Sequence, residues 1–331
     1  MSRVAAVIPH WNRRDLLDPL FSSLRSQTRP FDEIIVVDNG STDGSAEAAE
    51  GLAARVLRMG SNLGFAAAVN RGMEAADGAD WIAILNNDVT LDPEWLATLL
   101  AALEQEKEKV YFATGKILRT ADPTIIDGTF DELSRGACAC RCGAGKPDST
   151  LWDQPRRIRS APMTAALFRR DLFRDLGPLD ESFGSYLEDV DFGLRCALAG
   201  VHGIYVPAAR AYHRGSATLG EWKNDTVRQL SRNQVLLAAK HFAGQSRWPI
   251  VAGQLLWGML ALRHGRALSY LGGKISGFRD ARRLNRIRPC QVPKKEQLQA
   301  ILEAGEQTIL EIQRQTGFDW YWRAYFWLLP R

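Results

Sequence analysis

Carboxylate, amide and imidazole side chains gather at three places in this chain where they could bind a cation or move a proton. The segment Asn86–Asp88 ends a short apolar run, the segment Glu188–Asp191 holds three acids in four residues, and His213 follows a later apolar run. Carboxylates and imidazoles are ligands of divalent cations, and a carboxylate placed at a cleft can serve as a general base. These residues are the candidates for chemistry, and the elements around them must decide which act together.

Asp88 and His213 are the plausible metal pair. A carboxylate oxygen from a strand end and an imidazole from a later loop suit a hard divalent cation, with diphosphate oxygens and water completing the shell. Each residue has a purely structural alternative. Asn86, Asn87 and Asp88 could form an Asx-type turn after a core strand, and a single histidine is more often structural than a ligand.

The acidic cluster stands in the first turn of an expected helix. Acids there complement the helix dipole and contribute roughly 0.3–1 kcal/mol each, which is the structural alternative. Glu188, Asp191 and Arg195 share one helical face, whereas Asp189 points elsewhere. The cluster therefore divides into residues that tie down the helix and one carboxylate, Asp189, that is available as a base.

Asp38 ends another apolar run. An ionised carboxylate only accepts hydrogen bonds, so Asp38 suits an imide N–H such as N3 of uracil or thymine. The alternative is that Asp38 begins an Asx turn in the sequence Asp-Asn-Gly-Ser.

Four strand-then-helix units in the first hundred residues position these groups. Apolar runs predict strands, and helical spacing or Ala-rich stretches predict a helix after each. The pattern calls for a mostly parallel α/β sheet with helices on both faces, whose strand-end loops converge on one crevice. The expected strands are 4–8, 33–37, 55–59 and 81–85, with Pro9 stopping the first and a helix beginning at Pro93 after the fourth.

The remainder divides into an insertion, a return to core elements, and a tail. The pattern loosens between 110 and 160, and we expect an insertion over the crevice at about 119–160. A short helix at 171–176, a helix from Tyr186 to Ala199 and a strand at 204–206 closed by Pro207 complete a domain of residues 1–220. The sequence of residues 221–331 predicts a helical region that is rich in basic and aromatic side chains. No G-x-G-x-x-G or Walker A sequence follows the first strand, which disfavours a nicotinamide enzyme.

Composition sets outer limits on the class of protein. A chain of 331 residues with 46% apolar and 24% charged residues can bury a substantial core. No charged and apolar leader opens the chain, so we expect a cytoplasmic protein. Cys138, Cys140 and Cys142 lack a fourth ligand at zinc-like spacing and are interpreted as reduced thiols in a loop or hairpin.

Six motifs in order resemble family-2 glycosyltransferases of the GT-A fold. The resemblance covers about residues 4–218, roughly two thirds of the chain. The motifs are IPHWNRRDLL, EIIVVDNGSTDGS, SNLGFAAAVNRGM, ILNNDV, GSYLEDVDFGLRCALAG and HRGS.

The resemblance implies an inverting transfer from a nucleotide-diphosphate sugar, with Mg²⁺ or Mn²⁺ as the cofactor. Asn86-Asn87-Asp88 stands at the family's Asp-x-Asp signature, with Asn where the family has the first Asp. Asp88 would hold the metal, His213 would assist the metal or diphosphate, and Asp189 would be the catalytic base. The donor pocket would be framed by Pro9, Asn12, Asp38, Asn62, Gly64, Asn70, Asn86 and Asn87, with Glu188, Asp191 and Arg195 in support.

Within that family the chain most resembles bacterial rhamnosyltransferases that use dTDP-rhamnose in polysaccharide assembly. The alternatives are a UDP-sugar transferase using galactofuranose or N-acetylglucosamine, and a catalytically silent nucleotide-sugar-binding protein. The expected acceptor is a glycan, lipid-linked in polysaccharide assembly, with one sugar added per encounter.

The tail concentrates positive charge. From Lys240 to Lys295 there are twelve Lys or Arg and one acid. The apolar run Trp248–Leu262 is shorter than the roughly 20 residues of a transmembrane helix. It suits a surface that rests on anionic lipid at the inner face of the plasma membrane, and the alternative is a core helix pair or a homodimer interface. No nucleic-acid module accompanies the charge, so we expect no nucleic-acid partner.

Overall fold

The structure is a computed structural model that describes residues 2–52, 54–106, 109–215, 222–284 and 294–329. The chain forms two compact units. Unit 1 comprises Met1–Phe130, Gly143–Cys196 and Gly200–Thr218, and unit 2 comprises Asp131–Cys142, Ala197–Ala199 and Leu219–Arg331.

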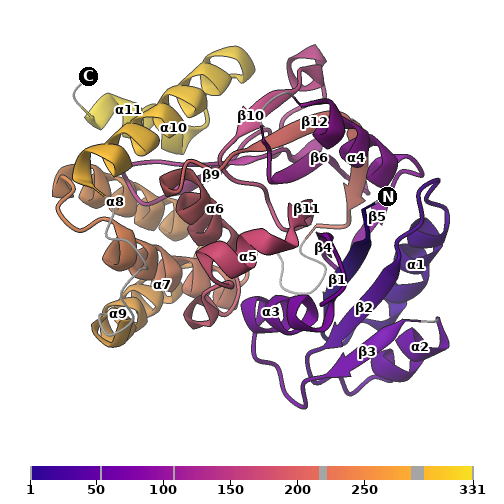
Figure 1. The fold of residues 1–331 in the computed structure, drawn as a ribbon. Helices are drawn as coiled ribbons and strands as arrows, with labels where there is room; N and C mark the ends of the chain where they lie inside the picture. Colours follow the sequence, from indigo (N-terminus) through magenta and orange to yellow (C-terminus); the bar gives the residue numbers. More distant parts are fainter. Residues whose placement is uncertain (1, 53, 107–108, 216–221, 285–293, 330–331) are drawn as a thin grey trace. The chain divides into compact units, whose positions relative to one another are not determined.

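Unit 1 is built on a mixed, mostly parallel sheet (Figure 1). β11 runs antiparallel to both of its neighbours, so the strands on either side of it point the same way. β5 (Val89–Leu91) pairs with β12, and β7 (Ile126–Gly128) pairs with β6. The order across the sheet is β10 (Arg156–Ile158), β12 (Gly203–His213), β6 (Phe112–Arg119), β11 (Ala165–Arg169), β4 (Trp81–Leu85), β1 (Val4–His10), β2 (Glu33–Asp38) and β3 (Arg55–Arg58).

Helices cover both faces of this sheet, as the strand-then-helix pattern predicts. Side chains alternate along a strand, so Val4, Ala6 and Ile8 of β1 face one layer and Val7 faces the other. The first layer contains α1 (Leu17–Arg25), α2 (Ser45–Gly51) and α4 (Trp95–Gln105), which join those three residues in one apolar core. The second contains α3 (Phe65–Ala75), α5 (Arg170–Leu176) and α6 (Glu188–Leu198).

The second layer packs closely because small residues face the sheet. A Cβ added at Gly72 of α3 would lie 2.3 Å from Val7 Cγ1. Phe168 of β11 meets Phe192 of α6 and Phe173 of α5 at ring-centroid distances of 6.0 and 5.6 Å. The carboxyl ends of β1, β2, β3, β4, β6 and β12 consequently lie at one edge of a rigid sheet.

Several predicted boundaries are wrong. β1 continues through Pro9 to His10, because Pro9 lies near the strand end where fewer ladder bonds are needed. β12 continues through Pro207 to His213 by way of a bulge between Val206 and Arg210. Both errors treat proline as a stop where the sheet accommodates it.

Two further differences come from tertiary packing. The segment 110–160 contains β6, an eight-residue strand in the middle of the sheet, so the loosened pattern hid a core strand. α4 begins at Trp95, two residues after Pro93, where the sequence predicted its start.

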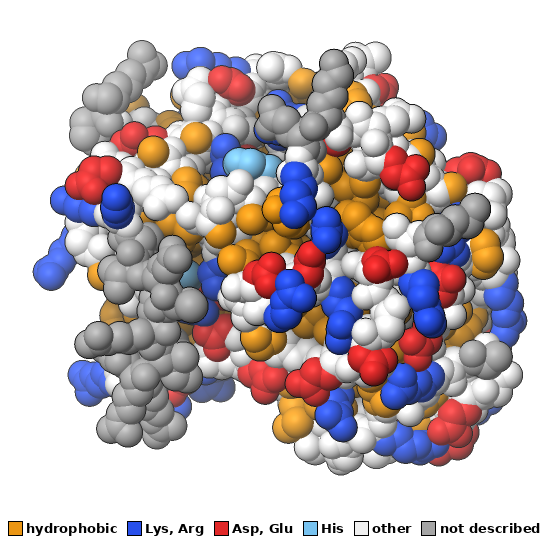
Figure 2. All heavy atoms as spheres, in the orientation of Figure 1, with side chains coloured by type: hydrophobic (Ala, Val, Ile, Leu, Met, Phe, Trp, Pro, Cys, Tyr) orange, Lys and Arg blue, Asp and Glu red, His pale blue; other side chains and the backbone are white. Residues whose placement is uncertain are grey.

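Charged side chains of both signs intersperse over α2, β3 and α3 (Figure 2). Arg58 pairs with Glu47 and Glu50 at 2.8 and 3.0 Å, and Arg71 pairs with Glu74 at 3.1 Å. Exposed pairs of this kind contribute about 0–1 kcal/mol each, so they add little to the stability of unit 1.

Unit 2 is helical apart from one hairpin, β8 (Asp131–Leu133) and β9 (Ala139–Arg141). This hairpin lies within the stretch expected to be a single insertion, yet it groups with the helices. Cys138, Cys140 and Cys142 are buried, free thiols of the hairpin and the residue after it. The helices are α7 (Asn224–His241), α8 (Arg247–Arg263), α9 (Ala267–Leu284), α10 (Lys295–Thr316) and α11 (Trp320–Leu328).

Polar anchors hold the hairpin and the last two helices together. Arg135 pairs with the buried Glu306 of α10 at 2.7 Å, and Tyr325 of α11 donates to the same carboxylate at 2.7 Å. A charged group buried in this way is tolerated because its partners satisfy it. α11 therefore packs on α10.

Candidate functional site

The Asn-Asn-Asp segment turns the chain from β4 into β5 at the carboxyl edge of the sheet. The Asn86 N–H donates to the Thr164 carbonyl at 2.9 Å, and the Arg214 N–H donates to the Asp88 carbonyl at 2.9 Å. The Asn87 amide lies 3.1 Å from Nδ1 of His10 at the end of β1. Three separate parts of the chain thus fix the position of this polar strand end.

Asp88 and His213 lie together, and a third residue joins them. His213 Nε2 is 3.0 Å from Asp88 Oδ1, and His213 Nδ1 is 2.9 Å from Asp127 Oδ2. Burial lowers the pKa of His213, but the hydrogen bonds and charges of Asp127 and Asp88 outweigh that effect and raise the pKa to about 9. The His213 side chain is therefore the positively charged imidazolium at neutral pH, with one N–H facing each of the two carboxylates.

This arrangement fits a divalent cation. If His213 keeps its Nδ1 proton and donates it to Asp127, the other ring nitrogen, Nε2, faces Asp88. A cation between Nε2 and Asp88 would then replace the proton on Nε2. One oxygen and one imidazole nitrogen suit Mn²⁺ or Mg²⁺ when substrate oxygens complete the shell. No group of three or more His, Cys, Asp or Glu side chains is placed to hold a metal alone within the part of the chain that the structure describes.

Sequence reasoning missed Asp127. It lies in β7, inside the stretch interpreted as an insertion, and no motif surrounds it. The pairing of β7 with the end of β6, beside β12, brings it to His213. A usable signal was the polar residue between Ile126 and Gly128 in a short apolar run.

Hydrogen bonds join the loop after β1 to the loop after β2. Asp38 is buried and accepts from the Ser41 N–H, three residues further along the chain, at 3.2 and 3.3 Å. Asn12 accepts from the Thr42 N–H at 3.0 Å, and its own N–H donates to Ser41 Oγ at 2.7 Å. Asn12 adopts φ 53°, a conformation that asparagine tolerates better than most residues. Pro9 lies in β1 opposite Val37.

The loop after β3 depends on Asn39, another residue that sequence reasoning missed. Its side-chain amide donates to Asn62 Oδ1 and to the Gly64 carbonyl, both at 3.1 Å, and its Oδ1 accepts from the Leu63 N–H at 2.9 Å. Asn62 and Gly64 are thus held beside the end of β2. The signal was present, because Asn39 directly follows Asp38.

Gly64 also joins this loop to the acidic cluster. It has φ +93°, and an added Cβ would lie 2.8 Å from the Gly184 backbone. The next two N–H groups donate to this same segment, from Phe65 to Ser185 Oγ at 3.1 Å and from Ala66 to the Gly184 carbonyl at 2.9 Å. The start of α3 is therefore bonded to the loop that leads into α6.

Asn70 serves the same connection instead of facing the strand-end loops. Its amide donates to the Leu179 carbonyl and to Glu181 Oε1, both at 2.9 Å, and its Oδ1 accepts from the Leu179 N–H at 2.9 Å. These bonds use both N–H groups of the amide and position the 179–181 segment. The role of Asn70 in lining the donor pocket stays a prediction.

The acidic cluster opens α6. Asp191 is fully buried and pairs with Arg195 at 3.1 Å, and Arg195 also donates to the carbonyls of residues 176, 177 and 178. Glu188 is buried, whereas Asp189 is half-buried. Asp191 and Arg195 tie the helix down, which is the division expected from helical spacing.

The backbone before the cluster is strained. Tyr186 and Leu187 adopt φ 70° and 67°, a region that costs of order 1–3 kcal/mol for such side chains. The bonds from α3 to residues 184 and 185 help to hold this turn. Asp189 is thus presented by a rigid, bonded loop.

His10 is a further polar residue at this edge. Burial lowers its pKa and outweighs the opposing charges of Asp38, Asp43 and Asp15. When Nδ1 accepts from the Asn87 amide, the proton of the neutral ring is on Nε2, which has no hydrogen-bond partner among the described residues. Buried donors are seldom left unsatisfied, so Nε2 is a candidate donor to a bound ligand.

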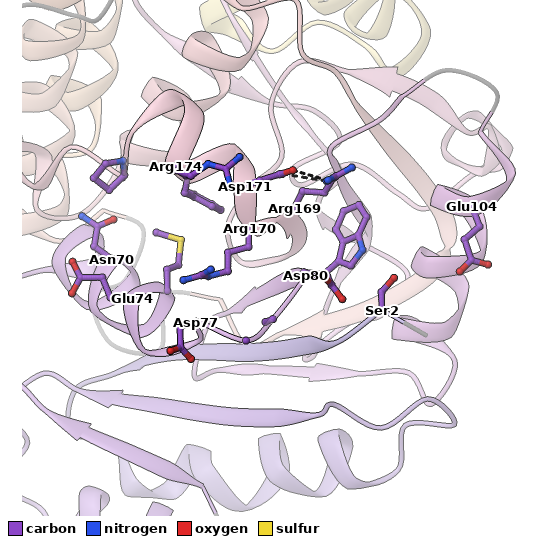
Figure 3. A pocket seen from close by; sticks show the side chains of 16 residues that line it. Ser2, Asn70, Glu74, Asp77, Asp80, Glu104, Arg169, Arg170, Asp171 and Arg174 are labelled. Atoms are coloured by element: carbon purple, nitrogen blue, oxygen red, sulfur yellow. Dashed lines mark hydrogen bonds and ion pairs between the residues drawn. The ribbon is translucent and has the colours of Figure 1, made fainter.

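A pocket of about 1180 Å³ lies elsewhere in unit 1, at the start of β4 and the end of β11 (Figure 3). Asp80 and Trp81 stand at the amino end of β4, so this pocket is at the opposite edge from Asp88. Arg169 and Asp171 pair within it at 2.6 Å. Among the residues predicted to form the site, only Asn70 lines it, so we assign the candidate chemistry to the carboxyl edge.

Two family models match the sequence. The one described as Glycosyl transferase family 2 matches residues 5–125, and the one described as Glycosyl transferase family group 2 matches residues 81–278. Together they cover the elements of unit 1 that carry the candidate site.

Curated relatives are similar at modest identity. N-acetylglucosaminyl-diphospho-decaprenol L-rhamnosyltransferase of Mycobacterium tuberculosis is 29% identical over 270 residues, which are 75% of this chain and 87% of the relative. The O-antigen biosynthesis protein RfbC of Myxococcus xanthus is 27% identical over 65% of this chain and 18% of its own length.

Solved structures share the fold. GalNAc-T7 with UDP, GalNAc and Mn²⁺ superposes with a TM-score of 0.63 at 14% identity, over 96% of this chain and 58% of the longer chain. The mannosyltransferase PcManGT of Pyrobaculum calidifontis, in complex with GDP-Man and Mn²⁺, has a TM-score of 0.54 at 16% identity. The match covers 98% of this chain and 86% of the mannosyltransferase chain.

Proposed function

The chain belongs to glycosyl transferase family 2, a family of inverting nucleotide-sugar glycosyltransferases, and on this basis we propose that it transfers rhamnose from dTDP-rhamnose to a lipid-linked glycan. Membership is carried by the model that matches residues 81–278, more than half of the chain. The identity of the sugar is the proposed part.

One observation supports rhamnose as the donor sugar. The relative that covers 75% of this chain, and is itself covered over 87% of its length, is named a rhamnosyltransferase. The same name places N-acetylglucosaminyl-diphospho-decaprenol as that relative's acceptor. We extend the acceptor class, a polyprenyl-diphosphate glycan, to this chain as part of the proposal.

The donor is proposed to lie across the ends of β1, β2 and β4. Asp38 suits the imide N–H of thymine or uracil, because an ionised carboxylate only accepts. Asn12, Asn39 and Asn62 hold the surrounding loops. Asn86 and Asn87 lie toward the diphosphate, where amide N–H groups can donate to phosphate oxygens.

Asp88 and His213 are proposed to hold Mg²⁺ or Mn²⁺ at the diphosphate. When bound, this cation would stabilise the negative charge that develops on the departing phosphate oxygen. Asp127 orients the His213 ring by accepting from Nδ1. The observation that supports this role is the pair of metal-ligand side chains, one carboxylate and one oriented imidazole.

Asp189 is proposed as the base. It would take the proton of the acceptor hydroxyl as that oxygen bonds to the anomeric carbon, while the bond from that carbon to the diphosphate oxygen breaks. A single in-line displacement inverts the anomeric configuration. The hydrogen bonds between α3 and residues 184–185 support Asp189 in a fixed position before the acceptor arrives.

A donor panel tests the proposal. The purified chain is incubated with dTDP-rhamnose, UDP-galactofuranose or UDP-N-acetylglucosamine and a polyprenyl-diphosphate N-acetylglucosamine acceptor, and released nucleoside diphosphate and glycan mass are measured. We expect acceptor-dependent release from dTDP-rhamnose. Release from a UDP-sugar alone contradicts the rhamnose proposal, and no release from any donor favours a silent binding protein.

A further inference from the structure

Exposed apolar side chains are concentrated in unit 2. Among the described residues, two of the thirteen large exposed hydrophobic side chains belong to unit 1, and the other eleven lie on α8, α9 and α11. Leu268 and Ile275 are 85% and 71% exposed, and Trp327 is 82% exposed. Scattered apolar residues are normal on a protein surface, but such a concentration marks an interaction site.

The exposed residues form a stripe on each of the two consecutive helices. Spacings of three, four and seven residues place side chains on one face of a helix. The α8 stripe is Trp248, Val251, Leu255, Met259 and Leu262, and the α9 stripe is Leu268, Leu271, Ile275 and Phe278.

Both stripes lie on the same side of the α8–α9 hairpin. The two helices meet where Tyr270 OH donates to the Gln254 carbonyl at 2.8 Å and where Gly258 faces the Tyr270 ring. From this contact line, the α8 stripe is displaced by roughly 80° and the α9 stripe by roughly 120° in the direction of increasing residue number, at about 100° per residue. Because the helices are antiparallel, displacements in the same sense bring the two stripes to one side.

The other side of α9 is already occupied. α7 and α9 lie side by side (Figure 1), and glycines allow close approach: a Cβ at Gly273 would lie 2.3 Å from the Arg228 carbonyl oxygen. A Cβ at Gly277 would lie 2.7 Å from the Arg232 carbonyl oxygen. The apolar stripe of α9 is therefore not needed for packing within unit 2.

Positive charge borders the stripes. Arg247 and Arg263 stand at the two ends of α8, and Arg279 and Arg282 continue the α9 stripe beyond Phe278. All four are exposed, and Arg247, Arg263 and Arg282 make no ion pair with any residue that the structure describes. Arg286 and Arg288, which the sequence also places in this cluster, lie outside the described residues.

We propose that the α8–α9 face is a docking surface for an anionic phospholipid bilayer. Aliphatic side chains with tryptophan and a rim of arginine match the acyl boundary and the anionic headgroups respectively. None of the described helices is long and apolar enough to cross a membrane, so this contact is peripheral. The inference concerns lipid binding and does not depend on which sugar the enzyme transfers.

Charge decides between a bilayer and a second copy of the chain. Two copies related by a twofold axis would bring the same arginines toward one another, which is unfavourable without acids on the face. Asp280 is the one acid between Lys240 and Lys295, and it already pairs with Arg232 at 2.9 Å. An anionic surface instead satisfies every arginine.

Vesicle flotation of the full chain tests the proposal. Vesicles of phosphatidylcholine with phosphatidylglycerol are compared with phosphatidylcholine alone. We expect flotation with the anionic vesicles, weakened by added salt. The triple variant Leu271→Gln, Ile275→Gln, Phe278→Gln should bind about tenfold or more weakly, because these side chains lose apolar contact.

The charge variant Arg279→Glu, Arg282→Glu should lose a similar amount of affinity for the anionic vesicles. The control variant Lys295→Glu, Arg314→Glu on α10 should bind these vesicles as the unaltered chain does. All substituted side chains are exposed, so the melting temperatures should be unchanged. Light scattering runs in parallel. Absence of flotation, or full binding by the triple variant, overturns the proposal. An unaltered chain that is dimeric without lipid, with a monomeric triple variant, assigns the face to a second copy and also overturns it.

Discussion

The carboxylates of the candidate site differ in their surroundings. Asp191 is buried against Arg195, and Asp88 and Asp127 share the His213 imidazole. Asp189 is half-buried at the start of α6. Residue types alone do not separate these acids, but their partners do.

Replacing the proposed base should remove chemistry and leave binding. Asp189→Asn keeps the size of the side chain and cannot accept a proton, so transfer should fall by about 10²–10⁴-fold. Donor binding, measured by calorimetry, should be unchanged. Asp175→Asn, an exposed acid of the same unit that pairs with Arg174, is the control and should be fully active. Normal turnover by Asp189→Asn would remove the assignment.

Asp88 and Asp127 should differ in their effect on metal binding. Asp88→Ala removes a proposed ligand and should abolish Mn²⁺-dependent binding of the nucleoside diphosphate. Asp127→Asn leaves both ligands but loosens the His213 ring, so the affinity for Mn²⁺ should fall by about 10–100-fold. Calorimetry with and without Mn²⁺ measures both effects. Asp122→Asn, an exposed acid nearby in sequence, should bind normally, and an equal effect of all three variants would contradict the site.

At the scale of elements, contacts between loops position the site more than any one strand does. The start of α3 is bonded to residues 184 and 185, Asn70 holds residues 179–181, and Arg195 holds residues 176–178. The strained turn at Tyr186 and Leu187 persists because these bonds surround it. The acidic helix and the donor loops therefore form one connected set in unit 1.

A glycine comparison tests this connection. Gly64→Ala introduces both a positive-φ penalty and a clash with the Gly184 backbone at 2.8 Å, whereas Gly60→Ala, at φ +76°, has open space around its Cβ. A positive φ costs Gly60→Ala about 1–2 kcal/mol, whereas Gly64, at φ 93° and ψ 171°, is in a backbone region that is essentially limited to glycine, so its alanine variant has a larger backbone penalty in addition to the clash. Gly64→Ala should therefore lower the free energy of unfolding further than Gly60→Ala, measured by urea denaturation, and should reduce turnover. Equal losses would show that the close approach does not matter.

At the scale of the molecule, the residues of the candidate site belong to unit 1 and the exposed apolar face belongs to unit 2. This division predicts that the two activities can be altered separately. The substitutions on α9 that weaken vesicle binding leave every residue of the proposed donor site unchanged.

Ligand binding should stabilise the fold in a donor-specific way. A ligand at about 100 times its dissociation constant adds about 2.7 kcal/mol to stability. With Mn²⁺ present, dTDP-rhamnose should raise the melting temperature of the chain, and Asp88→Ala should lose most of that shift. A shift with UDP-N-acetylglucosamine and none with the dTDP-sugar would redirect the donor assignment.

The sequence by itself determined the α/β order of strands and helices, the polar strand ends and the pairing of Asp191 with Arg195. These features rest on local periodicity, which the chain encodes within a few turns or strands. Only the tertiary structure decided that Asp127 meets His213, that Asn39 organises the loop after β3, that Asn70 positions residues 179–181 and that β6 lies inside the sheet. Each depends on contacts between segments far apart in sequence, where no local pattern records the partner.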